Sequence, residues 1–162
     1  MTNLFHKCIK VILDHEGGYI DDPYDLGGET KYGIAKAFFP HLDIKNLTID
    51  QAKQIYWNKY WLPMKLDSID DELIALQLFD MGVNAGIRTA IRLAQRIAKV
   101  NVDGDLGTKS ATAINSYIGD FVSKYQEARI MYYVDITINR NTNLRFLKGW
   151  IRRVFNTKFN EN

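Results

Sequence analysis

Glu16, Asp25 and Thr30 are residues near the N-terminus whose types and spacing suit acid–base chemistry. They lie in the sequence DHEGGYIDDPYDLGGETKYGI, where a helical pattern ends at Glu16 and glycine-rich turns follow. An acid at a helix end, shielded by aromatic side chains, can hold a proton near neutral pH and donate it to a departing glycosidic oxygen. The loop after the helix could fold back and place Asp25 and Thr30 opposite Glu16. From spacing alone, a surface acid followed by ordinary turns fits equally well.

Aromatic side chains are dense in the first half of the chain, and such side chains stack on the C–H faces of sugar rings. Aromatic residues at helical spacing usually pack in the core, so we expect about two-thirds of this set to be structural. From the set we predict that Tyr19 and Trp57 line a glycan-binding cleft. The full set is Tyr19, Tyr24, Tyr32, Tyr56, Trp57, Tyr60 and Trp61.

Asp80 and Asn84 form a second polar pair close to Gly86. Because they are four residues apart, they share one face of a helix. In a cleft they could hydrogen-bond the N-acetyl or hydroxyl groups of a glycan, and we predict them as substrate-binding residues. An ordinary turn between two helices explains the same residues equally well.

The elements that must position these residues are mainly helices. A first amphipathic helix is predicted over residues 4–15, with Thr2 or Asn3 as its cap and two glycines at its end. Irregular or hairpin structure follows from Gly18 to Gly33, and a brief helical turn over residues 34–39. Further helices are predicted from Thr48 through Tyr60 until Pro63, from Ser68, over residues 87–99, from Thr108 through Ile118, from Asp120, and from about Asn143. The fold class is mainly α, with two closely packed halves.

The amino-acid composition argues against several classes of protein. The 162 residues are 46% hydrophobic and 25% charged, which is typical of a globular protein. A net charge of +2 is not that of a nucleic-acid-binding protein. The single Cys8 cannot form an internal disulfide, and no apolar run reaches the roughly 20 residues of a membrane span. The N-terminus has few basic residues and an interrupted apolar pattern, so we predict no signal peptide.

The sequence NVDGDLGT resembles a calcium-binding loop only in part. An EF-hand needs glycine after the third ligand and a glutamate at the twelfth position, whereas this chain has Leu106 and Thr112 there. Three scattered histidines and one cysteine offer no zinc spacing. We therefore predict no metal and no other cofactor, and interpret the segment as a turn that caps the next helix.

The long motif at the N-terminus resembles glycoside hydrolase family 108, bacterial and phage N-acetylmuramidases known as endolysins or secretion activators. The family order is Glu-Gly-Gly-Tyr, Asp-Pro, Asp-x-Gly-Gly and Thr-x-x-Gly-Ile. Later segments are similar as well, so the resemblance extends from about Phe5 to Val154. The matching segments are Glu16–Tyr19, Asp22–Pro23, Asp25–Gly28, Thr30 with Gly33–Ile34, IYWNKYWLP, FDMGVNAG, VDGDLGTKSATAIN and FLKGWIRRV.

The resemblance implies a lysozyme-like helical fold with a short irregular or β-hairpin segment after the first helix. It implies a lysozyme-like catalytic region over residues 1–90 and a helical peptidoglycan-binding region over residues 91–162, packed as one unit. The implied activity is hydrolysis of the β-1,4 bond between N-acetylmuramic acid and N-acetylglucosamine. Glu16 matches the catalytic acid, and the positions of Asp25 and Thr30 match without settling their roles.

Two other functions stay open at this point. In a lytic transglycosylase one acid suffices and the muramyl 6-hydroxyl is the nucleophile; in a wall-binding or secretion-accessory protein there is no catalysis. In each case the partner is peptidoglycan glycan strands. We expect a monomer that is made in the cytoplasm, is released by a holin or a secretion system, and acts at the cell wall.

Overall fold

The structure, a computed structural model, describes residues 1–16, 18–20 and 28–160. Asp25, one of the predicted site residues, lies outside these ranges. The elements in chain order are α1 (Asn3–Glu16), β1 (Thr30–Lys31), β2 (Ile34–Ala35), α2 (Ile49–Tyr56), the π-helical η1 (Trp57–Trp61), α3 (Leu62–Met64), the 3-10 helix η2 (Leu66–Ser68), α4 (Glu72–Ala85), α5 (Ile87–Ile97), α6 (Thr108–Asn115), α7 (Phe121–Asn139), the 3-10 helix η3 (Asn141–Asn143) and α8 (Leu144–Asn156). The predicted mainly α class is confirmed.

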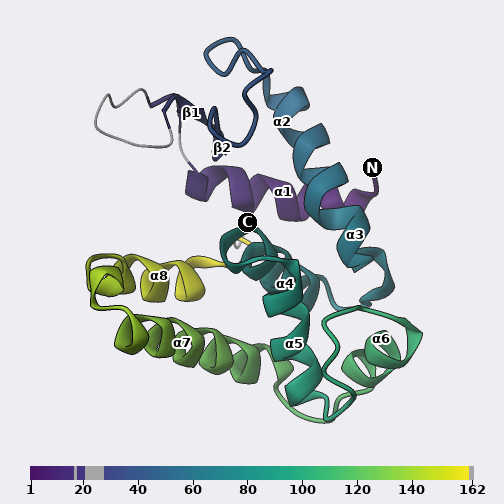
Figure 1. The fold of residues 1–162 in the computed structure, drawn as a ribbon. Coiled ribbons are helices and arrows are strands. Elements are labelled where there is room, and N and C mark those ends of the chain that lie inside the picture. The colour runs from purple at the N-terminus through teal and green to yellow at the C-terminus, as the bar shows by residue number, and fades with distance from the viewer. Residues whose placement is uncertain (17, 21–27, 161–162) are drawn as a thin grey trace.

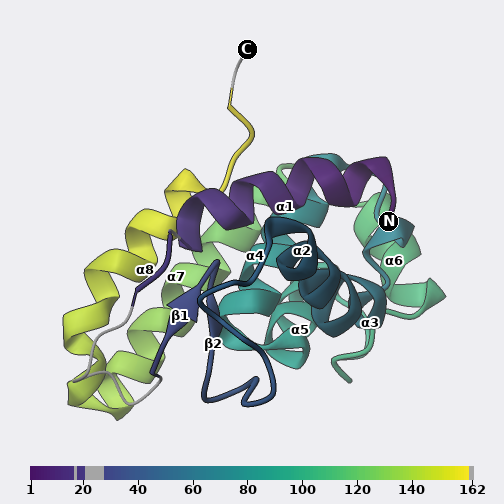
Figure 2. The same ribbon diagram turned by 90° about the horizontal axis from the view of Figure 1, so that it is seen from above.

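Helix α4 lies at the centre of the molecule and packs against α1, α5 and α7 (Figures 1 and 2). It is the most deeply buried helix, because its residues from Ile74 to Gly82 are all buried. The antiparallel pair α7 and α8 lies on one side of it, while α2 and α3 lie on the other (Figure 1). Segments from both halves of the chain therefore share one core around α4.

Helix α1 follows the predicted amphipathic pattern. Phe5, Cys8, Ile9 and Ile12 are all fully buried, so one face of the helix belongs to the core. The hydroxyl of Thr2 accepts a hydrogen bond from the backbone N–H of Phe5 at 3.3 Å, which makes Thr2 the cap. The last residue of the helix is Glu16.

The predicted hairpin is confirmed as the two short strands β1 and β2. Thr30 pairs with Ala35 in antiparallel register, and both residues at the turn, Tyr32 and Gly33, have positive φ angles of 53° and 72°. Such angles define the type I′ turn, whose twist matches that of the strands. The predicted helical turn over residues 34–39 is wrong at its start, because Ile34 and Ala35 are β2; turns follow only after them.

Helix α2 begins as predicted, because Thr48 and Gln51 form a capping box. The helical path then widens into η1, regains α geometry in α3 and runs to Met64, past the predicted end at Pro63. Pro63 is accommodated because it lies in the first turn of α3, where no intrahelical N–H bond is required.

The start of α4 differs from the prediction. Ser68 ends η2, and the cap is Asp71, whose carboxylate accepts bonds from the backbone N–H groups of Leu73 and Ile74 at 2.8 and 2.9 Å. In the second half, Asp120 caps α7 as expected, whereas α6 ends at Asn115 rather than continuing to Ile118. None of the helices in the described ranges is long and apolar enough for a membrane span.

Candidate functional site

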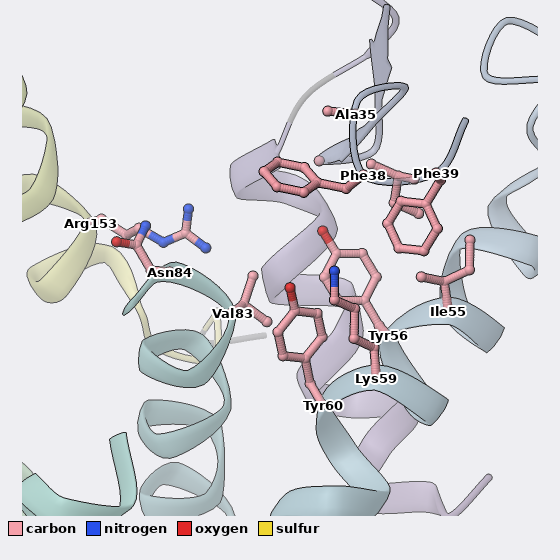
Figure 3. A pocket seen from close by; sticks show the side chains of 12 residues that line it. Ala35, Phe38, Phe39, Ile55, Tyr56, Lys59, Tyr60, Val83, Asn84 and Arg153 are labelled. Carbon is pink, nitrogen blue, oxygen red and sulfur yellow. The ribbon is translucent and has the colours of Figure 1, made fainter. Parts of the chain in front are cut away.

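A pocket of about 400 Å³ lies between the hairpin and α2 on one side and the end of α4 with α8 on the other (Figure 3). Its walls thus come from segments that are far apart in the sequence. The lining residues are Gly33, Ile34, Ala35, Phe38, Phe39, Ile55, Tyr56, Lys59, Tyr60, Val83, Asn84 and Arg153.

One wall of the pocket is aromatic and carries a cation. The Lys59 ammonium lies 4.7 Å from the ring centre of Phe39 and 5.6 Å from those of Phe38 and Tyr60. These distances are within the range of cation–π attraction. The hydroxyl of Tyr56 donates a hydrogen bond of 3.0 Å to the backbone oxygen of Tyr32, so this wall is tied to the turn of the hairpin.

The opposite wall presents Asn84 and Arg153 (Figure 3). Asn84 lies near the end of α4, and its side-chain oxygen accepts a hydrogen bond of 3.0 Å from the hydroxyl of Tyr133 in α7. The amide is therefore held by a residue of the second half of the chain. Arg153, in α8, brings a guanidinium to a pocket that otherwise belongs to the first half.

Asp80 lies fully buried in α4 and holds Arg153 in place. Its Oδ1 atom accepts a hydrogen bond of 2.9 Å from Arg153 Nε and lies 2.9 Å from Arg153 Nη2. Its Oδ2 atom accepts bonds from Arg129 Nη2 and, at 3.1 Å, from Thr157 Oγ1. Arg129 is fully buried as well and also donates to Gln77. The carboxylate thus joins α4 to α7, α8 and the residue after α8.

Charge in this network favours the ionised form of Asp80. Burial by itself would raise the pKa of the carboxyl group, but the neighbouring guanidinium groups of Arg153 and Arg129 hold that pKa below its usual range. The ionised carboxylate of Asp80 therefore lies against the guanidinium groups of both Arg129 and Arg153, and Arg153 also lines the pocket.

Thr30 lies in β1, in the hairpin beside the pocket, and is not one of the described residues that line it. Four peptide units separate Glu16 from Ile20, so their Cα atoms lie within about 14 Å of each other. Ile20 in turn pairs with Thr30 through two backbone hydrogen bonds of 2.8 Å. Thr30 also pairs with Ala35, which lines the pocket. The end of α1 and Thr30 are therefore brought close to the same cavity, whereas Asp25 lies outside the described residues.

The predicted substrate-binding residues divide into two groups. Asn84 lines the pocket, and Tyr19 is 39% exposed near the hairpin. Trp57 is half-buried and does not line the pocket: its ring lies against Phe5, with centroids 5.0 Å apart. Asp80 does not fit direct contact with a glycan, because it has no exposed surface and both of its oxygens are already bonded within the protein. We assign it a positioning role instead.

Lys59, Tyr60 and Arg153 are pocket residues that the sequence patterns did not single out as site residues. Lys59 and Tyr60 lie in the aromatic segment after α2, so the density of tyrosine and tryptophan there was a usable signal. Arg153 lies 73 residues from the Asp80 that holds it. No local spacing could connect the two.

Two family models match the chain. Residues 9–86 match the family described as glycosyl hydrolase 108. The N-terminal half belongs to glycosyl hydrolase family 108. Residues 89–155 match a predicted peptidoglycan domain. The two matches together support a glycoside hydrolase that acts on peptidoglycan, and hence on the cell wall.

Similarity to a solved structure extends over nearly all of the chain. The structure of Brucella abortus SagA is 27% identical, has a TM-score of 0.77, and the alignment covers 94% of this chain and 90% of that one. The lysozyme-like fold expected from the resemblance is confirmed. No protein with a curated description matches the chain.

Proposed function

We propose that this family 108 protein is an N-acetylmuramidase that hydrolyses the β-1,4 bond between N-acetylmuramic acid and N-acetylglucosamine. The observation that carries the proposal is the place of the Glu-Gly-Gly-Tyr motif. It begins where α1 ends, next to the hairpin whose strand β2 lines the aromatic pocket. An acid at this position is suited to protonate a leaving glycosidic oxygen.

In the proposed mechanism Glu16 is the general acid. Asp25, with Thr30, orients water or stabilises the oxocarbenium-like transition state. Thr30 is held for such a role by backbone pairing on both sides, with Ile20 and with Ala35. Whether the anomeric configuration is inverted or retained depends on the separation of the two carboxyl groups.

The pocket suits a glycan in its chemistry. Sugar rings can lie against the rings of Phe38, Phe39 and Tyr60, and the side-chain amide of Asn84 can hydrogen-bond an N-acetyl or hydroxyl group. Tyr19 is proposed as a further contact, since 39% of its surface is exposed. Trp57 acts through the aromatic cluster that supports the wall.

At the level of the chain, we propose a catalytic region over residues 1–90 and a peptidoglycan-binding region over residues 91–162. The shared core around α4 supports their working as one unit. We further propose a monomer that needs no cofactor and reaches the wall through a holin or a secretion system, in lysis, secretion or wall remodelling.

Digestion of purified peptidoglycan by wild type and by Glu16→Gln tests this function. We expect the variant to release reducing ends about 10²- to 10⁴-fold more slowly, since general acid catalysis contributes about that factor. Asp14→Asn is a matched control, because Asp14 is an exposed acid in the same helix. Equal release by wild type and Glu16→Gln would remove Glu16 from the mechanism, and no release by wild type would favour a wall-binding protein.

The products separate hydrolysis from transglycosylation. A hydrolase leaves a reducing end, whereas a lytic transglycosylase leaves a 1,6-anhydro end that is lighter by one water. We expect mass spectrometry of the released fragments to find the hydrolysed form. A product pool made of anhydro ends would assign the transglycosylase reaction instead.

A further inference from the structure

Helix α8 lies at one edge of the molecule, beside α7 (Figures 1 and 2). Among the described elements it packs chiefly against α7 and η3. Its inner side is covered, because Val154 is fully buried and the ring of Trp150 stacks on that of Tyr133 in α7, with centroids 5.1 Å apart. The opposite side of α8, which we call the outer α8 face, points away from these contacts.

An apolar row runs along the outer α8 face. Its members recur every three or four residues, so they lie in one line on the helix: Leu144, Leu147, Ile151 and Phe155. Leu144 and Phe155, at the two ends of the row, are 64% and 58% exposed. A shallow cavity of about 300 Å³ joins Phe155 to Met131 of α7, which is 53% exposed. The exposed apolar surface therefore extends from α8 onto α7.

A row of cations runs beside the apolar row. Arg145, Lys148 and Arg152 are all exposed and share the same helical spacing. Lys148 and Arg152 line a second shallow cavity, of about 320 Å³, together with Leu144 and Ile151, so the two rows are neighbours. The described carboxylates form no ion pair with any of the three cations. Their charge is therefore available to a ligand.

Acidic residues are few around the outer α8 face. Residues 136–160 contain no aspartate or glutamate, and Glu161 lies outside the described residues. On α7, Glu127 lines the cavity beside Phe155 and pairs with Lys124 at 3.2 Å, and Asp135 is exposed. The exposed charge of α8 itself is wholly positive.

The outer α8 face is separate from the candidate active site. Arg153 lines the pocket and is bound to Asp80, so it takes no part in the row of cations. The pocket shares no lining residue with either shallow cavity, and the proposed catalytic acids Glu16 and Asp25 belong to the pocket side. A ligand of this face is therefore independent of a glycan in the pocket.

We infer that the outer α8 face binds the surface of a membrane that contains anionic phospholipids. The cations attract the phosphate headgroups, and the apolar row enters the boundary between headgroups and acyl chains. An anionic polymer fits less well, because it would pair with the cations but leave Leu144 and Phe155 in water. A second copy of the chain also fits less well, because a two-fold contact would bring two positively charged faces together.

Sedimentation of the full chain with lipid vesicles tests this inference. Vesicles of phosphatidylglycerol mixed with phosphatidylcholine are compared with vesicles of phosphatidylcholine alone. We expect at least about tenfold tighter binding to the anionic vesicles, because each cation near such a surface contributes about fivefold. Added salt should weaken this binding by screening the charges.

Lys148→Gln combined with Arg152→Gln tests the row of cations. We expect at least about tenfold weaker binding to the anionic vesicles, because two cations are lost. Lys10→Gln combined with Lys109→Gln is the matched control, since it removes the same charge from exposed positions on α1 and α6. The control should bind like wild type.

Leu144→Gln combined with Phe155→Gln tests the apolar row. We expect about tenfold weaker binding to the anionic vesicles, because less apolar surface is buried in the boundary region. Ile118→Gln is the control, because Ile118 is 96% exposed after α6 and away from α8. Melting temperatures check that each variant is folded.

Weaker binding by both double variants and by neither control would support a membrane-binding face. Equal binding of wild type to the two kinds of vesicle, or binding to neither, would overturn the inference. Full binding by the variant with Leu144→Gln and Phe155→Gln would overturn it as well, because charge alone would then suffice, as for an anionic polymer. Sedimentation velocity tests the remaining alternative: a dimer that this variant dissociates would assign the face to a second copy instead.

Discussion

The surroundings of Cys8 determine how reactive its thiol is. It is fully buried in α1 between core side chains, and burial, with a smaller contribution from the negative charge of Glu72, raises the pKa of its thiol to about 12. A thiol with this pKa is almost entirely protonated at neutral pH, and the thiolate is the reactive form. Cys8 is therefore a core residue rather than a nucleophile.

Native protein should react very slowly with a thiol reagent such as iodoacetamide at pH 8, and urea-unfolded protein at the rate of a free cysteine. We expect this difference in rate because folding shields the Cys8 thiol from the reagent and also keeps it protonated. Mass spectrometry of the alkylated chain measures both rates. Rapid stoichiometric labelling of folded protein would contradict the buried position.

At the scale of an element, the turn before α6 depends on one buried side chain, Gln95 of α5. The two N–H groups of its amide nitrogen are shared among three acceptors: Asp103 Oδ1 at 2.8 Å, the backbone oxygen of Asp105 at 3.0 Å and Ser110 Oγ at 3.0 Å. Its amide oxygen accepts from the backbone N–H of Gly104 at 2.9 Å. Gly104 has a φ of 81°, which an L side chain rarely adopts. The segment that resembled a calcium loop is thus built as a turn around an amide.

Gln95→Leu should lower the free energy of unfolding by about 2–3 kcal/mol, because a buried N–H and other polar partners lose their hydrogen bonds. Urea unfolding followed by circular dichroism measures the change. Gln54→Leu is the control: Gln54 is exposed on α2, and such substitutions usually change stability by less than about 0.5 kcal/mol. Equal midpoints for the two variants would mean that the Gln95 bonds do not hold the turn.

At the scale of the whole molecule, Asp80 connects the two halves of the chain. It lies in α4, within the part that matches glycosyl hydrolase 108, while Arg129 and Arg153 lie in the part that matches the predicted peptidoglycan domain. Removing one partner of a buried ion pair leaves uncompensated charge, at a cost of about 3–5 kcal/mol. The stability of each half is therefore coupled to the other.

Asp80→Asn should destabilise the protein by about 3–5 kcal/mol at neutral pH, with both halves unfolding together. The pH dependence has a definite sign. The folded pKa of Asp80 lies below the unfolded value of about 3.9, so its contribution is present above pH 4 and is lost as the pH falls through the folded pKa. The difference between wild type and variant should shrink below about pH 4.

Urea unfolding between pH 3 and pH 7 measures this difference directly. Asp70→Asn, at an exposed residue just before α4, is the control and should behave like wild type. Other carboxyl groups with lowered pKa are common to wild type and variant, so they cancel in the comparison. A variant as stable as wild type at pH 7 would argue against coupling through Asp80.

The sequence alone determined those features that depend on neighbours within a few residues. Thr48 and Asp120 cap helices as predicted, and the ordered motif from Glu16 to Ile34 indicated the family. A hairpin follows the first helix as predicted, although its second strand lies in residues that were predicted as a helical turn. Helical periods, caps and tight turns are made by hydrogen bonds over four residues or fewer, so local patterns are sufficient.

Only the tertiary structure decided how distant segments share the site. Asp80 had the type and helical spacing of a ligand-binding residue, but the crossing of α4, α7 and α8 buried it between two arginines. The same crossing carried Arg153 into a pocket that the sequence placed wholly in the first half. Burial and long-range pairing depend on which helix faces meet, because the energy of a buried charge is set by its whole surroundings rather than by its neighbours in the chain.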